Sequence, residues 1–186
     1  MILDQPPIVT RSLLLRPLVL DDAGVAYALS NEAPARKWLS SQIYRDAAHA
    51  LSVVQILIRL QSDPGDPRLG AYVLAVERRA QPGMIGHVGL SPLGPDVEVG
   101  FGIAVAHQRR GFACEAVAAM CAWAFQAFHL PRIIGVCDAG NIASSRTLVS
   151  SGFVHQETKV LHFQGTEQMV DVYARSHVID KGEREA

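Results

Sequence analysis

The sequence lacks several features that would mark particular classes of protein. Neither sign of charge dominates, because 17 lysines and arginines stand against 18 aspartates and glutamates, for a formal net charge of -1. This balance argues against a nucleic acid as the main partner, which normally requires a clearly basic face. No uninterrupted apolar run approaches the roughly 20 residues that a membrane-spanning helix needs. The start, MILDQPPIVT, has no signal-peptide pattern, so we expect a cytoplasmic protein.

Cysteine is also scarce. The three cysteines, Cys114, Cys121 and Cys137, form no CxxC pair and leave one odd thiol under any pairing. The first two lie seven residues apart in one predicted helix, so we expect small buried apolar residues and a reducing compartment. The histidines are scattered, and the motifs HExxH, GxSxG and GxxxxGK[ST] are absent. We therefore expect no metal site.

The remaining composition is that of one globular domain over residues 1–186, with 49% hydrophobic residues. Hydrophobic periodicity and turn residues predict the order β-α-α-β-β-β-α-β-α-β-β. The predicted strands are 8–18, 70–78, 84–93, 97–105, 132–138, 153–163 and 167–179, and the predicted helices are 20–32, 46–61, 112–129 and 142–151. This order predicts an α/β (α+β) fold, with a single mixed, mostly antiparallel sheet of about seven strands and flanking helices.

The predicted strand VEVGFGIAV, residues 97–105, has two different faces. Period two places Val97, Val99, Phe101, Ile103 and Val105 on a core face. Glu98 and two glycines occupy the other face. Glycine inside a strand marks a bulge or a close approach to the backbone, so either a ligand or a packed neighbour fits there. A lone strand glutamate is more often exposed to solvent than catalytic.

The helix predicted from Phe112 begins without a cap. The preceding residues, Gln108 to Gly111, offer no side-chain oxygen other than the Gln108 amide. Free amides at a helix start form an anion site. Gly111 would let the anion approach the main chain closely, and the two arginines add positive charge and hydrogen-bond donors. A phosphate-type ligand or water would satisfy them, and the sequence favours the phosphate. Asn141 caps the later helix, which stops at Gly152.

These segments resemble the GNAT superfamily of N-acetyltransferases, in particular its RimJ/RimL-like branch. QRRGFA, residues 108–113, is similar to the family's acetyl-CoA motif Q/R-x-x-G-x-G/A. The longer segment EVGFGIAVAHQRRGFACEA resembles the strand, loop and helix of that branch, and NIASSRTLVSSGF resembles its N-x-x-S…G-F segment. The resemblance covers about residues 8 to 178 and implies the GNAT (acyl-CoA N-acyltransferase) fold.

The resemblance implies acetyl transfer from acetyl-CoA to a primary amine, without a metal. The residues implied to hold the cofactor are Ile103, Ala104, Val105, Gln108, Arg109, Arg110, Gly111, Phe112, Ala113 and Asn141. Glu98 would be the base, directly or through a water, and Ser144 occupies the family's serine position. Many members carry a tyrosine where this chain has Leu148, so Tyr173, Ser144 or water would protonate the departing thiolate. A serine at position 144 is also explained as an ordinary residue of a helix start, and Asn141 is also explained as an ordinary helix cap.

The acceptor pocket implied by the resemblance is built by the segment of the first two helices, residues 20–61, and by the loop after residue 162. The first segment holds Trp38, Tyr44 and Arg45. No acidic cluster marks a polycationic aminoglycoside. A protein N-terminus, such as that of a ribosomal protein, is slightly preferred over a small-molecule amine. A catalytically inactive acyl-CoA-binding domain and a protein without CoA affinity are the alternatives. We expect a monomer or a homodimer.

Overall fold

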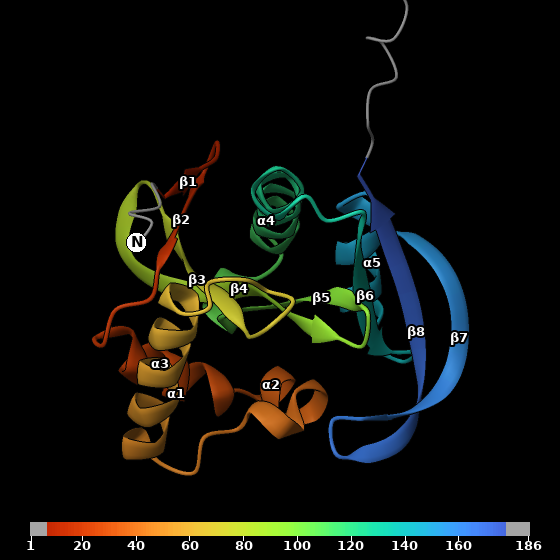
Figure 1. Ribbon diagram of the computed structural model, residues 1–186. Coiled ribbons are helices and arrows are strands. Elements are labelled where there is room, and N and C mark those ends of the chain that lie inside the picture. Colours follow the sequence, from red (N-terminus) through yellow and green to blue (C-terminus); the bar gives the residue numbers. More distant parts are fainter. Residues whose placement is uncertain (1–6, 178–186) are drawn as a thin grey trace, which may run out of the picture.

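The computed structural model describes residues 7–177 and contains one mixed sheet with helices on both faces (Figure 1). The predicted fold class is therefore confirmed. The sheet has eight strands in the order β1-β2-β3-β4-β5-β6-β8-β7. The strands are β1 (Ile8–Val9), β2 (Leu13–Pro17), β3 (Tyr72–Arg78), β4 (Gln81–Leu93), β5 (Asp96–Ile103), β6 (Arg132–Asp138), β7 (Val154–Phe163) and β8 (Thr166–Ser176). Residues 178 and 179, which we predicted as the end of the last strand, lie outside the described residues, as does most of the MILDQPPIVT segment.

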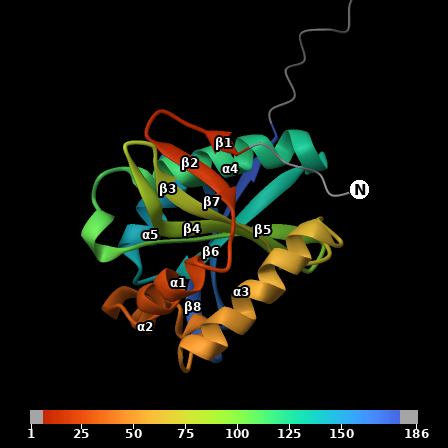
Figure 2. The same cartoon turned by 90° about the vertical axis from the view of Figure 1, so that its left-hand side faces the viewer.

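The helices are α1 (Asp22–Ser30), α2 (Ala33–Trp38), α3 (Ala47–Ser62), α4 (Phe112–Phe128) and α5 (Ile142–Ser150). Two 3-10 turns, η1 (Ser40–Gln42) and η2 (Val105–His107), join neighbouring elements. Helix α4 lies on one face of the sheet and α1 to α3 lie on the other, as the turned view makes clear (Figure 2). The sheet thus separates the uncapped helix from the first three helices.

The sequence predicted one strand over 8–18, and the structure divides this segment into β1 and β2, which pair antiparallel. The break occurs at Thr10 to Ser12, where the Thr10 hydroxyl accepts a hydrogen bond from the Leu13 amide at 2.9 Å. The Glu115 carboxylate of α4 accepts hydrogen bonds from the Thr10 hydroxyl and the Ser12 amide, both at 2.6 Å. These polar contacts turn the chain back and raise the number of strands to eight.

Helix α2 is a second difference. Pro34 was predicted to end the first helix, but it lies in the first turn of a separate short helix. Proline is favoured there because its missing N–H would be unpaired in any case. The predicted strand 97–105 also ends early, at Ile103, because the chain enters η2. Val105, predicted to face the core, is therefore 51% exposed.

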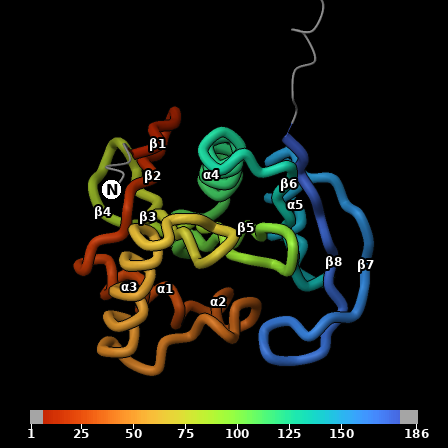
Figure 3. Tube along the Cα trace, in the orientation of Figure 1, coloured from red at the N-terminus to blue at the C-terminus, as the bar shows by residue number. Residues whose placement is uncertain are grey.

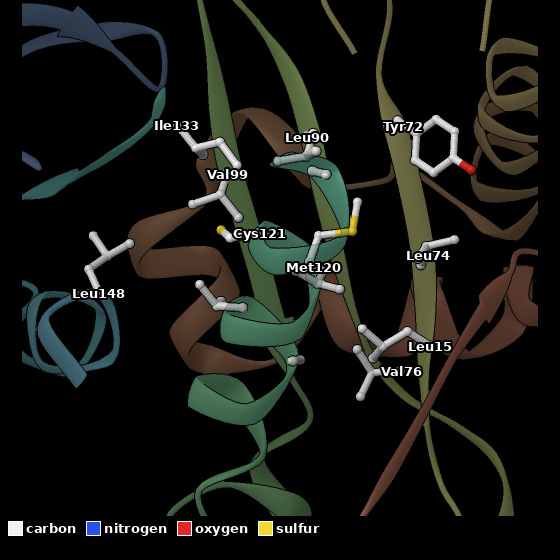
Figure 4. Close-up of a cluster of buried hydrophobic side chains, with 14 of the residues drawn as sticks. Leu15, Tyr72, Leu74, Val76, Leu90, Val99, Met120, Cys121, Ile133 and Leu148 are labelled. Atoms are coloured by element: carbon white, nitrogen blue, oxygen red, sulfur yellow. The ribbon is translucent and has the colours of Figure 1, made fainter. Parts of the chain in front are cut away.

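The main core lies between α4 and the sheet (Figure 4). Met120 and Cys121 of α4 pack toward Leu90 and Val99 of the central strands, and all four are buried. A fully buried side chain of the size of Met120 contributes about 1.5–3 kcal/mol. Burial raises the pKa of Cys121 to about 12, so this thiol behaves as the apolar residue that its position in the helix predicted.

Strands β4 and β5 approach very closely at Gly86. A Cβ atom on this residue would lie 2.2 Å from the carbonyl oxygen of Gly102. We expect Gly86→Ala to lower the free energy of unfolding by about 3 kcal/mol, because the two strands must separate. The matched control is Gly100→Ala, where the added Cβ meets nothing within 4 Å and the expected change is below about 0.5 kcal/mol. Equal losses in denaturant titrations of the two variants would contradict this account.

Candidate active site

Strand β5 places Glu98 on the face of the sheet opposite α4. Its pairing with β4 is regular from Asp96 to Ile103, so no bulge interrupts the predicted alternation. Val97, Val99 and Ile103 are buried in the core as expected. Gly100, two residues after Glu98, is exposed, and a Cβ atom there would meet nothing within 4 Å. The face beside Glu98 is therefore open, whereas Gly102 further along is covered by the His87 ring.

The environment of Glu98 changes its acidity. Within residues 7–177, no group forms a hydrogen bond or an ion pair with this carboxyl. Burial raises the pKa of Glu98 to about 7, because partial removal of water disfavours the charged form. A carboxyl group with this pKa exchanges a proton readily at neutral pH and can act as a general base or acid.

A gap between β5 and β6 begins next to Glu98. The two strands run parallel, and their one ladder pair joins Glu98 to Ile134. Toward their carboxyl ends, no further ladder pair joins the two strands within the described residues. An opening in a sheet at this place leaves main-chain donors and acceptors without a neighbouring strand.

The direction of each amide decides which donor faces the gap. The Ala104 amide donates to the Ile85 carbonyl at 2.9 Å, and the Val105 amide donates to the Glu32 carboxylate, also at 2.9 Å. Main-chain groups alternate in direction along a strand, so the Ile103 amide points away from β4 and toward the gap. Of the three predicted cofactor residues Ile103, Ala104 and Val105, the first alone offers its amide there.

The start of α4 is uncapped, as the sequence predicted. Gly111 occupies the cap position with φ +80° and provides no side-chain hydrogen bond. Among the described residues, no acceptor bonds to the amides of Phe112, Ala113 and Cys114. The Gln108 side-chain amide is engaged elsewhere, because it donates to the Ile103 carbonyl at 2.8 Å. Three free donors and the helix dipole make this end a site for an anionic group.

The charged residues around this turn favour an anion. Arg109 and Arg110 are both exposed beside the free amides. Glu115, in the first turn of α4, bonds instead to Thr10 and Ser12 on the neighbouring strands. Burial alone would raise the pKa of Glu115, but these hydrogen bonds outweigh it and lower the pKa. The carboxylate is therefore held toward β1 and β2.

The far side of the gap is formed by β6 and the start of α5. Asn141 caps α5, since its Oδ1 accepts a hydrogen bond from the Ser144 amide at 3.1 Å. The cap role that the sequence allowed is thus confirmed. Burial raises the pKa of the Cys137 thiol to about 11, and the Ser144 side chain beside it lowers this pKa in part.

Leu148, at the position of the family's tyrosine, and the candidate proton donor Tyr173 have distinct surroundings. Leu148 is 1% exposed and packs on Gly135, so α5 presents a hydrocarbon at this position. The Tyr173 hydroxyl is buried and lies 2.7 Å from the Ser145 hydroxyl. Tyr173 is therefore a partner of Ser145, and Ser144 is the hydroxyl nearest the start of α5.

Glu32 was not singled out by the sequence, although it bonds to the loop after β5. No motif marks it, because its partner is 73 residues away. Among residues 7–177, no group of three histidine, cysteine, aspartate or glutamate side chains could hold a metal ion. None of the helices in that range is both long and apolar enough to span a membrane.

Comparison with known proteins gives a consistent result. The family model described as "Acetyltransferase (GNAT) domain" matches residues 12–154. The uncharacterized N-acetyltransferase YoaA of Bacillus subtilis (strain 168) is 27% identical over 174 residues, which cover 91% of this chain and 96% of that protein.

Two solved structures share the fold. A putative ribosomal-protein-serine acetyltransferase from Vibrio cholerae has a TM-score of 0.76 and 22% identity, over 95% of this chain and 100% of that chain. RimL, a ribosomal L7/L12 alpha-N-protein acetyltransferase solved with coenzyme A, has a TM-score of 0.77 and 18% identity, over 91% of this chain and 97% of that chain.

Proposed function

Because the chain belongs to the GNAT family of acetyltransferases and is an N-acetyltransferase, we propose that its acceptor is the N-terminal amine of a protein. The family implies acetyl-CoA as the cosubstrate. The observation that carries the proposal is Glu98, a carboxyl with a pKa of about 7 beside an open face and at the head of the gap.

Residues of this chain fit both the diphosphate and the pantetheine arm of the cosubstrate. The free amides of Phe112, Ala113 and Cys114 bind the diphosphate, with Gly111 leaving space for it. Arg109 and Arg110 add positive charge from the surface. The gap between β5 and β6 then accepts the pantetheine arm as an additional strand-like segment, and Asn141 borders it from α5.

Transfer requires a neutral amine, because an ammonium group has no lone pair. The Glu98 carboxylate accepts a proton from the amine, directly or through a water. The nitrogen attacks the thioester carbon, and the Ile103 amide donates a hydrogen bond to the oxygen that becomes negative. The C–N bond forms, the C–S bond breaks, and the electron pair leaves with sulfur, while the second surplus proton on nitrogen passes to a water that relays it to the sulfur. Ser144 donates a hydrogen bond to this thiolate, and water completes its protonation.

The open face of the sheet beside Glu98 favours a polypeptide N-terminus as the acceptor. Gly100 leaves this face exposed, and an open approach suits the end of a polypeptide better than an enclosed pocket would. Two fold relatives are described as acetyltransferases of ribosomal proteins. Their identity to this chain is low, so they support the class of acceptor and not a particular protein.

A panel of acceptors tests the proposal. Peptides with free N-terminal serine, alanine or methionine and small polyamines are incubated with acetyl-CoA, and the products are measured by mass spectrometry. We expect kcat/KM for the best peptide to exceed that for any small amine by at least about tenfold, the effect of one remote contact. The matched control is the same peptide with a blocked N-terminus and an internal lysine. Faster acetylation of a small amine, or of the blocked peptide, would contradict the proposal.

A further inference from the structure

Helix α2 joins three loops that are far apart in the sequence. Its first anchor is Glu32, which occupies the cap position but makes no side-chain hydrogen bond to its own helix. Glu32 Oε2 instead accepts a hydrogen bond from the Val105 amide at 2.9 Å. Val105 opens η2, directly before the turn that leads to the uncapped start of α4. The carboxylate therefore ties α2 to the end of β5.

The second anchor is at the other end of the helix. The Trp38 ring lies over the turn between β6 and α5, where a Cβ atom on Gly140 would be 3.7 Å from Trp38 Cη2. The Lys37 ammonium lies 4.2 Å from the centroid of the same ring. Because one anchor follows β5 and the other follows β6, α2 bridges the carboxyl ends of the two strands. It lies on the side of the sheet that carries α1 and α3, the side of Glu98 (Figure 1).

The third anchor connects this region to the hairpin of β7 and β8. The Ser40 hydroxyl donates to the Gln164 carbonyl at 3.0 Å, and the Ser41 amide donates to Gln164 Oε1 at 3.1 Å. Figure 3 shows the end of the hairpin curving back toward α2. The ends of β5 and β6 and the hairpin are thus connected through α2 and the turn η1 that follows it.

The position of α2 depends on these contacts and on the hydrogen bonds from Arg36 to Asn31, because none of its residues is buried. A segment without buried apolar residues has little local stability of its own. Removing one polar anchor should therefore change the mobility of the whole helix. Of the three anchors, Glu32 is the one in which a charged group makes a hydrogen bond to another part of the chain, and this bond is correspondingly strong.

We infer that Glu32 is a positioning residue that fixes α2 across the open end of the gap and thereby shapes the acceptor side of the site. It acts through the Val105 amide and touches neither the acceptor nor the cosubstrate. The amide that faces the gap belongs to Ile103, so loss of the Glu32 contact leaves the binding of coenzyme A in place. The consequence for the acceptor rests on the function proposed above.

The experiment compares Glu32→Ala with Glu32→Gln, whose amide oxygen can still accept the Val105 hydrogen bond. We expect Glu32→Ala to raise KM for the acceptor peptide about tenfold, the size of one lost hydrogen bond to a charged group. The dissociation constant for coenzyme A should stay within about twofold. Glu32→Gln should restore most of the acceptor KM. Glu157→Ala, on the exposed edge strand β7, is the matched control and should change neither constant.

Hydrogen exchange provides a readout that does not depend on turnover. The amides of α2 should exchange about tenfold faster in Glu32→Ala and at the original rate in Glu32→Gln. Unchanged exchange, or an increase in the coenzyme A dissociation constant that matches the increase in KM, would overturn the inference. An enzyme that acetylates no peptide would contradict the proposed acceptor, and the exchange rates would still decide whether Glu32 fixes α2.

Discussion

Replacing Glu98 with glutamine should reduce kcat/KM for acetyl transfer by about 100- to 1000-fold, the range for loss of a general base. The substitution keeps the size of the side chain and removes its ability to take a proton. Glu98 faces away from the start of α4, so the affinity for coenzyme A should remain within about twofold. Initial rates and calorimetric titration measure the two quantities. A variant with unchanged rate would remove Glu98 from the mechanism.

The same carboxyl predicts the pH dependence of the rate. The base must be deprotonated before it can accept a proton, and burial raises the pKa of Glu98 to about 7. The rate of the original enzyme should therefore rise as the pH increases through about 7 and level off above it. In Glu98→Gln this step should be absent. A step that persists in the variant would have to come from another group.

Stability should respond in the opposite direction. A carboxyl whose pKa rises from 4.5 in the unfolded chain to about 7 in the folded protein keeps its proton better when folded. The free energy of unfolding therefore falls as the pH rises from about 4.5 to 7 and stays low above that range. The effect of this shift is at most about 3 kcal/mol. Glu98→Gln should be more stable than the original protein at pH 8 and similar to it at pH 4.5.

Substituting tryptophan for Gly111 should weaken coenzyme A binding by at least about 100-fold. The indole side chain would cover the three main-chain amides that are proposed to bind the charged diphosphate. The backbone at Gly111 has φ +80°, a conformation that L side chains rarely adopt. Gly94→Trp is the matched control, because Gly94 also has positive φ and open space around its missing Cβ. Gly94 lies in the turn between β4 and β5, so this control separates backbone strain from loss of the ligand site.

The two arginines should contribute much less than the backbone at this site. Arg109 and Arg110 are exposed, and solvent and salt screen exposed charges. The double variant Arg109→Ala/Arg110→Ala should raise the dissociation constant about three- to tenfold, and less at high salt. Titration calorimetry of the four proteins in one buffer gives the order of effects. A larger loss from the arginine variant than from Gly111→Trp would show that side chains, and not amides, hold the diphosphate.

The central unit could be predicted from the sequence because its signals are local. Period two in β5 separated Glu98 from the buried valines, and regular pairing with β4 preserved that alternation. The uncapped start of α4 was visible in the absence of a capping residue before Phe112. Asn141 was recognised as a cap by its place before a polar helix. Each of these depends on fewer than about ten neighbouring residues.

The remaining features depend on contacts that local patterns do not encode. Glu115 bonds to Thr10 across 105 residues, and this contact helps to divide the first predicted strand in two. The raised pKa of Glu98 follows from burial by other elements and not from its neighbours in the chain. The choice of Ile103 over Val105 as the amide at the gap required the partner of Val105, which is Glu32. Tertiary contacts of this kind override local preferences.

The single pair between Glu98 and Ile134 gives the sheet the mechanics of a hinge. The strands on either side form two antiparallel ribbons, β1 to β5 and β6 to β8, and this pair is the pivot between them. Displacement about a pivot grows with distance from it, so any widening of the gap is greatest at the carboxyl ends of β5 and β6. We therefore expect any adjustment to the width of a ligand at those ends and little at the Glu98 backbone. The proposed proton acceptor, Glu98, therefore lies at the pair that joins the two ribbons, where the least displacement is expected.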